Sequence, residues 1–139
     1  MSNAIENLVE AQKFAMSIRP KVGGFPYLAE ALRLAGVTRN LWFLPSCQSV
    51  YLTKTGAVVS QGTPLFIGNA DIPKFNREAL IRALRINQAG QSTFLDFLKA
   101  SWEAGVINYD VDLENRKVTY YGATGESYVE NYPAVEVRR

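Results

Sequence analysis

The sequence predicts an α+β fold made by internal duplication of one unit, two helices followed by a three-strand meander. The tripeptide "AGV" occurs at 35–37 and again at 104–106, each time where helix-like residues give way to strand-like ones. When residues 25–59 are laid on 94–128 without a gap, nine of the 35 positions are identical, where ordinary composition gives roughly two or three. The copies also agree in where helices begin and end and where strands turn, which supports a duplication.

The two helices of each unit are predicted from their spacing and their ends. The first helix has apolar residues at helical intervals, and a glycine suited to the left-handed conformation follows it in each copy. The second helix begins near Phe25 or Phe94, and Pro26 suits the first helical position because it lacks an N–H. "TFLD" (93–96) is typical of a helix cap with an acid three residues later. Each second helix ends at the glycine of "AGV".

The strands follow directly after these glycines. "INYDVDL" (107–113) alternates apolar and polar residues, as a half-buried strand does. "ENRK" is predicted to turn, "VTYYG" to return, and "SYVE" to form the third strand. The first copy has "NLWFL", "SVYLT" and "AVVS" in the same order. Each unit therefore ends in a meander of three strands.

The domain organisation follows from the size of the repeats. Repeat 1 covers about 4–60, a connector covers 61–75, and repeat 2 covers about 76–130. A half of about 65 residues buries too little surface to be stable alone. We therefore expect the halves to pack as one domain, 1–139, about a pseudo-twofold axis.

Composition excludes several classes of function. The chain has no histidine, which rules out histidine bases, histidine-activated nucleophiles and histidine metal ligands. Its single cysteine rules out an internal disulfide and a cysteine-rich zinc site. The net charge of +2 comes from mixed charges without a basic block, so nucleic-acid binding is not expected. We expect no cofactor, no metal, no catalytic set, no membrane span and a cytoplasmic location.

Asp110 and Asp112 are two residues apart on a predicted strand, so both carboxylates leave one face. Such a pair can perform acid–base chemistry when the environment separates the two pKa values. The simpler interpretation is a solvated face, paired across the strand with Arg116 or Lys117, and we favour it.

The stretch "LPSCQSVY" (44–51) is where the two copies differ most clearly, because the second copy has an ordinary turn, "LENRKVTY", at this place. Cys47 can act as a nucleophile only if a positive group lowers its pKa, and a lone cysteine is more often a small core residue. The candidate ligand-binding residues are Ser46, Cys47, Gln48, Ser49 and Tyr51.

Tyrosines gather in the last strands of the chain, at positions 120, 121, 128 and 132. Because neighbours on a strand alternate faces, some of these rings are expected to point outward. Outward tyrosines suit a protein interface, since they offer a large area at low entropy cost. Plain cross-strand pairing explains the same pattern equally well.

The "AGV" pattern, "LPSCQSVYLT" and above all "VTYYGATGESYVENYPAV" resemble the YbcV-like family of small bacterial and prophage proteins, which are sometimes labelled phage envelope proteins. The resemblance extends over nearly the whole chain. It implies a compact α+β domain of bacterial or phage-derived origin, and it brings no catalytic residue.

Three functions remain open from the sequence. The first is a non-enzymatic binding or interaction module that forms a homodimer or binds another protein. The second is a small-molecule pocket between the two halves, with or without weak enzymatic activity, that uses the loop 44–51. The third is a structural phage component, which the family label alone supports.

Overall fold

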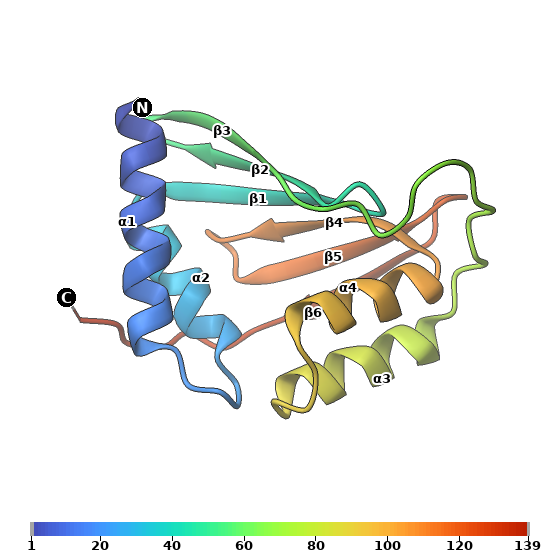
Figure 1. Cartoon of the computed structure of the whole chain (residues 1–139). Coiled ribbons are helices and arrows are strands. Elements are labelled where there is room, and N and C mark those ends of the chain that lie inside the picture. The colour runs from blue at the N-terminus through green and yellow to red at the C-terminus, as the bar shows by residue number, and fades with distance from the viewer. Residues whose placement is uncertain (1, 139) are drawn as a thin grey trace.

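The structure is a computed structural model that describes residues 2–138, and it confirms the α+β class (Figure 1). Each half has two helices and three strands in the predicted order. The first half comprises α1 (Asn3–Ile18), α2 (Phe25–Leu34), β1 (Val37–Phe43), β2 (Gln48–Thr53) and β3 (Gly56–Gln61). The second comprises α3 (Arg77–Gln88), α4 (Phe94–Glu103), β4 (Val106–Asp112), β5 (Lys117–Gly122) and β6 (Ser127–Asn131).

The strands form one antiparallel six-stranded sheet in the order β3-β2-β1-β4-β5-β6. The two halves therefore meet at β1 and β4, and β3 and β6 lie at the two borders. Leu41 on β1 lies directly opposite Asp110 on β4, and these positions are also related by the shift of 69. A pseudo-twofold axis therefore passes between them.

Local signals fix the helix ends. Ser2 and Asn76 accept hydrogen bonds from backbone N–H groups in the first turns of α1 and α3. Thr93 and Asp96 form the predicted capping box at the start of α4, each satisfying a backbone donor of the other. Gly36 and Gly105 follow α2 and α4 with φ of 94° and 88°, a region that favours glycine. The strands then begin at the next residue.

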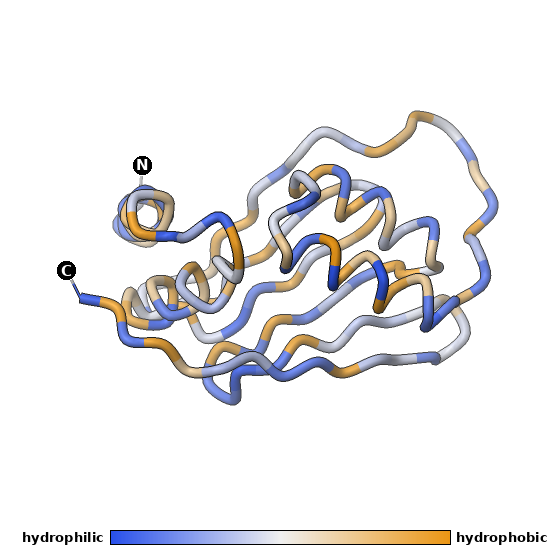
Figure 2. Tube along the Cα trace, turned by 90° about the horizontal axis from the view of Figure 1, so that it is seen from below, coloured by the Kyte–Doolittle hydropathy of each residue, from blue (hydrophilic) through white to orange (hydrophobic). Residues whose placement is uncertain are grey.

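All four helices cover the same face of the sheet, the inner face (Figures 1 and 2). The core between the layers contains Leu8, Leu80 and Phe97 from helices and Tyr51 and Tyr109 from strands. Aromatic rings form a chain across this core, in which Trp42 stacks on Tyr109 at 6.1 Å between centroids. Edge-to-face and stacked ring pairs of this kind stabilise a core beyond their burial.

The two meanders differ in one turn. In the first half Thr53 pairs with Gly56, whereas in the second half Tyr121 pairs with Ser127 across a longer loop. The shift that relates the halves is therefore 69 up to β2 and β5, and 70 between β3 and β6. The alignment without a gap is wrong by one residue after this turn, and Gly56 and Gly125 are not structural equivalents.

The connector between the halves packs against both of them for part of its length. Leu65 donates its backbone N–H to the carbonyl oxygen of Pro45 at 2.9 Å, and the ring of Phe66 lies 5.7 Å from that of Trp102. Ile67 is 98% exposed. Within residues 2–138, none of the helices is long and apolar enough to cross a lipid bilayer.

Candidate functional site

The outer face of the sheet, turned away from the helices, is open to solvent (Figure 2). The strand register arranges its side chains in rows that cross both halves. The middle row, read from β3 to β6, consists of Val59, Val50, Leu41, Asp110, Thr119 and Val129. It is apolar in the first half and mostly polar in the second.

The neighbouring rows are mixed, because Phe43 shares its row with Gln48 and Gln61, and Leu52 shares its row with Ala57 and Arg39. We define the apolar patch as the outward residues Leu41, Phe43, Val50, Leu52 and Val59 of the first half. Their equivalents in the second half are Asp110, Asp112, Thr119, Tyr121 and Val129. Val59 is 61% exposed at the border of the sheet, while Phe43 and Leu52 are each 37% exposed. The first half therefore has apolar side chains on its outer face that remain partly exposed to solvent.

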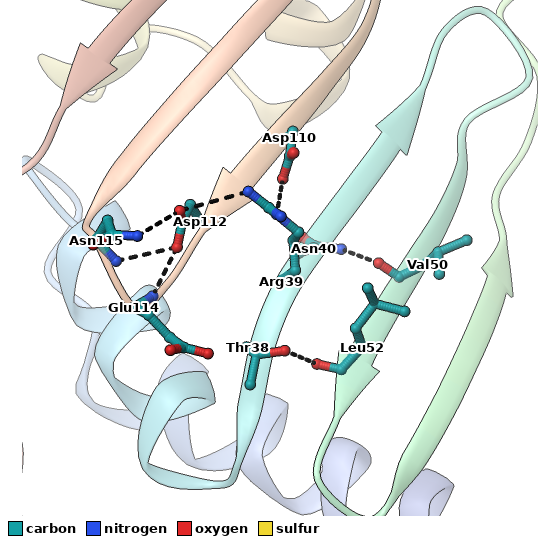
Figure 3. Close-up of polar contacts among 9 residues, drawn as sticks. All are labelled: Thr38, Arg39, Asn40, Val50, Leu52, Asp110, Asp112, Glu114 and Asn115. Atoms are coloured by element: carbon teal, nitrogen blue, oxygen red, sulfur yellow. Dashed lines mark hydrogen bonds and ion pairs between the residues drawn. The ribbon is translucent and has the colours of Figure 1, made fainter.

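Arg39 lies at the centre of the outer face and joins two carboxylates of the other half (Figure 3). Its Nε donates to Oδ1 of Asp110 at 2.9 Å, and its Nη2 lies 3.5 Å from Oδ2 of Asp112. The two carboxylates do leave one face, as predicted. Their ionic partner, however, is Arg39 from β1 and not Arg116 or Lys117.

Asp112 also organises the turn after β4 (Figure 3). Its carboxylate accepts the backbone N–H groups of Glu114 and Asn115 at 3.2 and 3.1 Å, and Nδ2 of Asn115 at 2.9 Å. Burial alone would raise the pKa of Asp112, but the hydrogen bonds from Asn115 and the charge of Arg39 hold the pKa below its ordinary value. The carboxylate of Asp112 is therefore suited to stabilising the turn as an anion and not to transferring a proton.

The turns after β1 and β4 share a left-handed residue and a hydrogen bond despite their different sequences. Cys47 and Arg116 occupy equivalent positions and both have a positive φ, 61° and 54°. The carbonyl oxygen of Cys47 accepts the N–H of Gly62 at 3.0 Å, and that of Arg116 accepts the N–H of Tyr132 at 3.1 Å. The divergence of "PSCQ" changes the side chains and the backbone before Cys47, where the Leu44–Pro45 peptide bond is cis.

The five predicted ligand-binding residues are divided between the two faces of the sheet and the turn. Ser49 and Tyr51 are buried on the inner face, where Nε2 of Gln12 donates to the hydroxyl of Tyr51 at 3.5 Å. Gln48 lies on the outer face, and Ser46 is exposed at the turn. The structure brings Ser46 and Gln48 together, because the backbone N–H of Gln48 donates to Oγ of Ser46 at 3.4 Å. A shared ligand for all five residues stays a prediction.

Cys47, the fifth of these residues, is 4% exposed. Its Sγ lies 3.7 Å from the carbonyl oxygen of Pro45. Burial raises the pKa of this thiol above its ordinary value. Because the thiolate is the reactive form, this environment supports the core interpretation of Cys47.

A groove of about 540 Å³ lies beside this turn, between the two halves. Its wall is mostly apolar, and it consists of Leu44 and Pro45 from the first half, Trp102 and Ile107 from the second, and connector residues Phe66, Gly68, Asn69, Ala70 and Ile72. The groove therefore reaches the predicted loop at its first two residues only. Among residues 2–138, no group of three or more acidic or cysteine side chains is placed to hold a metal ion.

The tyrosines of the second half are mostly not outward. Tyr120 is 5% exposed and lies opposite the half-buried Tyr128 on the inner face. Tyr132 packs edge-on against Phe25 at 5.1 Å between ring centroids, and burial raises its pKa to about 12. Tyr121 does face outward and is 36% exposed. The cross-strand interpretation therefore fits Tyr120 and Tyr128, the outward interpretation fits Tyr121, and Tyr132 packs against a helix instead.

Glu130 on β6 holds α3 against the sheet. Its carboxylate accepts Nη1 of Arg85 and Nε2 of Gln88, both at 2.6 Å, and the hydroxyl of Tyr128 at 2.8 Å. Burial alone would raise the pKa of Glu130, but these three hydrogen bonds hold the pKa below its ordinary value. The partners on α3 lie 42 and 45 positions away in the sequence.

Comparison with known proteins places the chain in a family. The family model described as "Protein of unknown function (DUF1398)" matches residues 13–131. The chain belongs to this family. The DUF1398 match runs from the last part of α1 to the end of β6, so it includes the outer face, the Arg39 cluster and the turn at Cys47.

Relatives within the mycobacteria are similar over nearly the whole chain. An uncharacterized protein of Mycobacterium bovis is 54% identical over 136 residues, which cover 98% of this chain and 83% of that protein. An uncharacterized protein of Mycobacterium tuberculosis shows the same identity and coverage. DUF1398 is therefore the family assignment, and the names of these relatives state no activity.

Proposed function

We propose that the protein is a non-enzymatic interaction module that binds a second copy of itself through the first half of its sheet. The contrast between Leu41, Phe43 and Val50 and their polar equivalents Asp110, Asp112 and Thr119 carries this proposal. Both halves build the same fold, so the fold itself does not require apolar side chains at Leu41 and Val50 on the open face. Contiguous exposed apolar surface of this kind usually marks an interaction site.

The charges of the first half also favour self-association. β2 and β3, with the sequences QSVYLT and GAVVSQ, contain no charged residue. In the second half, β5 contains Lys117 and β6 contains Glu130. Two copies that approach through β2 and β3 therefore bring no like charges of these strands together. No charged side chain of these strands loses its contact with water either.

Sedimentation analysis of the full chain at increasing concentration tests the proposal. We expect a monomer–dimer equilibrium for the natural sequence and a monomer for Val59→Lys. Val129→Lys is the matched control, because Val129 is the structural equivalent of Val59 on the same face, and it should still dimerise. A natural chain that stays monomeric at every concentration contradicts the proposal.

The groove supports a second candidate, a pocket for a small apolar molecule between the two halves. Leu44, Pro45 and Trp102 would contact such a molecule, and Asn69 could orient it. Indole serves as a probe: binding should shift the NMR signal of the Trp102 ring N–H, and Trp102→Leu should abolish the binding. A weak enzyme at the loop 44–51 further requires Cys47 to react with a thiol reagent in the folded state, and a protected thiol would argue against it.

Two further expectations remain proposals. A structural phage role rests on the YbcV-like resemblance, and it requires assemblies larger than a dimer in the same sedimentation experiment. A cytoplasmic location stays a proposal that rests on the sequence alone.

A further inference from the structure

The two border strands of the sheet differ in charge. β6 contains Glu130, whose carboxylate accepts hydrogen bonds from α3. β3 has six residues in continuous register with β2, no charge, no proline and no bulge. Folded proteins usually protect a border strand with one of these features, because unpaired backbone groups attract another strand.

The free backbone groups of β3 can be identified from the ladder. Gly62, just after β3, donates its N–H to the carbonyl oxygen of Cys47. In an antiparallel pair, alternate residues bond to the same neighbour, so Val58 and Ser60 face β2 in the same way. The N–H and C=O groups of Ala57, Val59 and Gln61 therefore point away from the sheet. In Figure 1, β3 forms the upper border of the sheet.

We propose that β3 pairs antiparallel with β3 of a second copy, around a twofold axis at Val59, so that the two sheets become continuous. This inference rests on the proposed self-association and names its geometry. Val59 then lies opposite Val59 of the second copy, and Ala57 lies opposite Gln61. Because the same three residues provide the free groups in both copies, every outward N–H meets a carbonyl oxygen.

Side chains on the outer face support this register. Leu41, Val50 and Val59 form one row that ends at the β3 border, so pairing at Val59 joins the apolar rows of two copies. Val59 is 61% exposed, which is more than Phe43 and Leu52 at 37% each. The side chain of Gln61 donates to the carbonyl oxygens of Ser46 and Gly62 within its own chain, so it does not occupy the free edge.

A face-to-face stack of two sheets is the competing geometry, and the Arg39 cluster argues against it. Arg39, Asp110 and Asp112 lie at the centre of the outer face, and a stack would remove all three charges from water. Burying an ion pair costs solvation that its attraction often fails to recover. Pairing at β3 leaves this cluster in solvent, two strands away from the border.

Cysteine cross-linking distinguishes the two geometries. In a Cys47→Ser background, Val59→Cys places two thiols on the axis, where Cα atoms of a hydrogen-bonded pair are about 5.5 Å apart, within disulfide range. Val50→Cys is the matched control on the same face. Its Cα atoms would be three strand spacings apart, about 14 Å, which is too far. We expect mild oxidation to cross-link Val59→Cys and to leave Val50→Cys monomeric on a denaturing gel.

A backbone variant tests the pairing without relying on a thiol. Val59→Pro removes one outward N–H, and an edge strand tolerates proline where the N–H faces solvent. Val59→Thr keeps the N–H and a β-branched side chain. We expect the proline variant to weaken dimerisation at least tenfold in sedimentation, and the threonine variant to keep it within about threefold.

The outcomes separate this inference from the proposed function. If the natural chain dimerises and Val50→Cys cross-links while Val59→Cys does not, the sheets stack by their faces and the β3 pairing is wrong. If it dimerises and neither variant cross-links, the pairing is also wrong although self-association stands. If it stays monomeric and neither variant cross-links, both proposals fail. Circular dichroism of each variant is the control for folding, since an unfolded variant would also fail to dimerise or cross-link.

Discussion

The two halves of this protein share one architecture and differ in what they present to solvent. Each inner face carries large side chains into a common core, with Tyr51 and Tyr120 at equivalent places. The outer faces have diverged: the first half shows the apolar patch, and the second shows Asp110, Thr119 and Asp112. The difference teaches that the helix-facing side chains and the turns determine the fold, and the open face is free to take another role.

The first prediction compares equivalent core residues and has the largest expected effect. Leu113 is 1% exposed, and its equivalent Leu44 is 5% exposed and borders the groove. Leu113→Ala should lower the free energy of unfolding by about 3 kcal/mol through lost burial and the cavity that remains. Leu44→Ala should cost about 1 kcal/mol less, because this side chain lines a groove and is less completely enclosed. Urea unfolding measures both, and equal losses would contradict the difference between the halves.

The second prediction compares the glycines that follow α2 and α4. A Cβ at Gly105 would lie 2.5 Å from the Cα of Phe75, whereas a Cβ at Gly36 would meet the Cβ of Lys54 at 3.7 Å. Gly36→Ala should therefore cost only the strain of a positive φ, about 1 kcal/mol. Gly105→Ala adds a backbone clash with the connector and should cost about 2 kcal/mol or more. Thermal unfolding of both variants checks the order.

Much of the architecture could be predicted because local residues determine it. The glycine after α4, the Thr93 capping box and the alternation in 107–113 each have a short-range physical cause, and the structure contains all three. The first strand lacks such an alternation. Apolar residues occur on both of its faces, since Trp42 packs inward while Leu41 and Phe43 point outward.

The rest depends on contacts between distant segments. Arg39 meets Asp110 across 71 positions, and Glu130 meets Arg85 across 45. No spacing in the sequence marks such partners, because the strand order β1-β4 creates the first contact and the packing of α3 creates the second. The divergence at Cys47 was visible in the sequence, but its burial was not, because Arg116 has the same left-handed conformation in the other turn and is only half-buried.

The third prediction uses an acid that only the second half has, since the first half carries Ser60 at the place of Glu130. The folded state holds the pKa of Glu130 below the ordinary 4.5. Its contribution to stability is therefore complete above about pH 4.5 and is lost as the pH falls through the lowered pKa.

Glu130→Gln should cost about 1 kcal/mol at neutral pH, because it weakens hydrogen bonds to the charged Arg85. It should also flatten the acid limb of a plot of unfolding free energy against pH. Ser60→Ala is the control and should leave that limb unchanged. Parallel acid limbs for Glu130→Gln and the natural chain would assign the acid sensitivity to other carboxylates.

The smallest effect is expected at the junction of the halves. Arg39 is 44% exposed in its side chain, so its pairs with Asp110 and Asp112 are screened by water and salt. Arg39→Gln should lower the free energy of unfolding by about 0.5 kcal/mol at low salt. The loss should shrink in 1 M sodium chloride, where the screening length is about 3 Å.

Asn108→Ala provides the matched control, because Asn108 is the structural equivalent of Arg39 on the same face. Its effect should not depend on salt, since asparagine carries no charge. If Arg39→Gln costs the same at low and high salt, the guanidinium stabilises the sheet by packing rather than by charge. Burying the cluster in a face-to-face stack would then be less costly, and the choice of β3 as the self-association surface would rest on its free backbone groups alone.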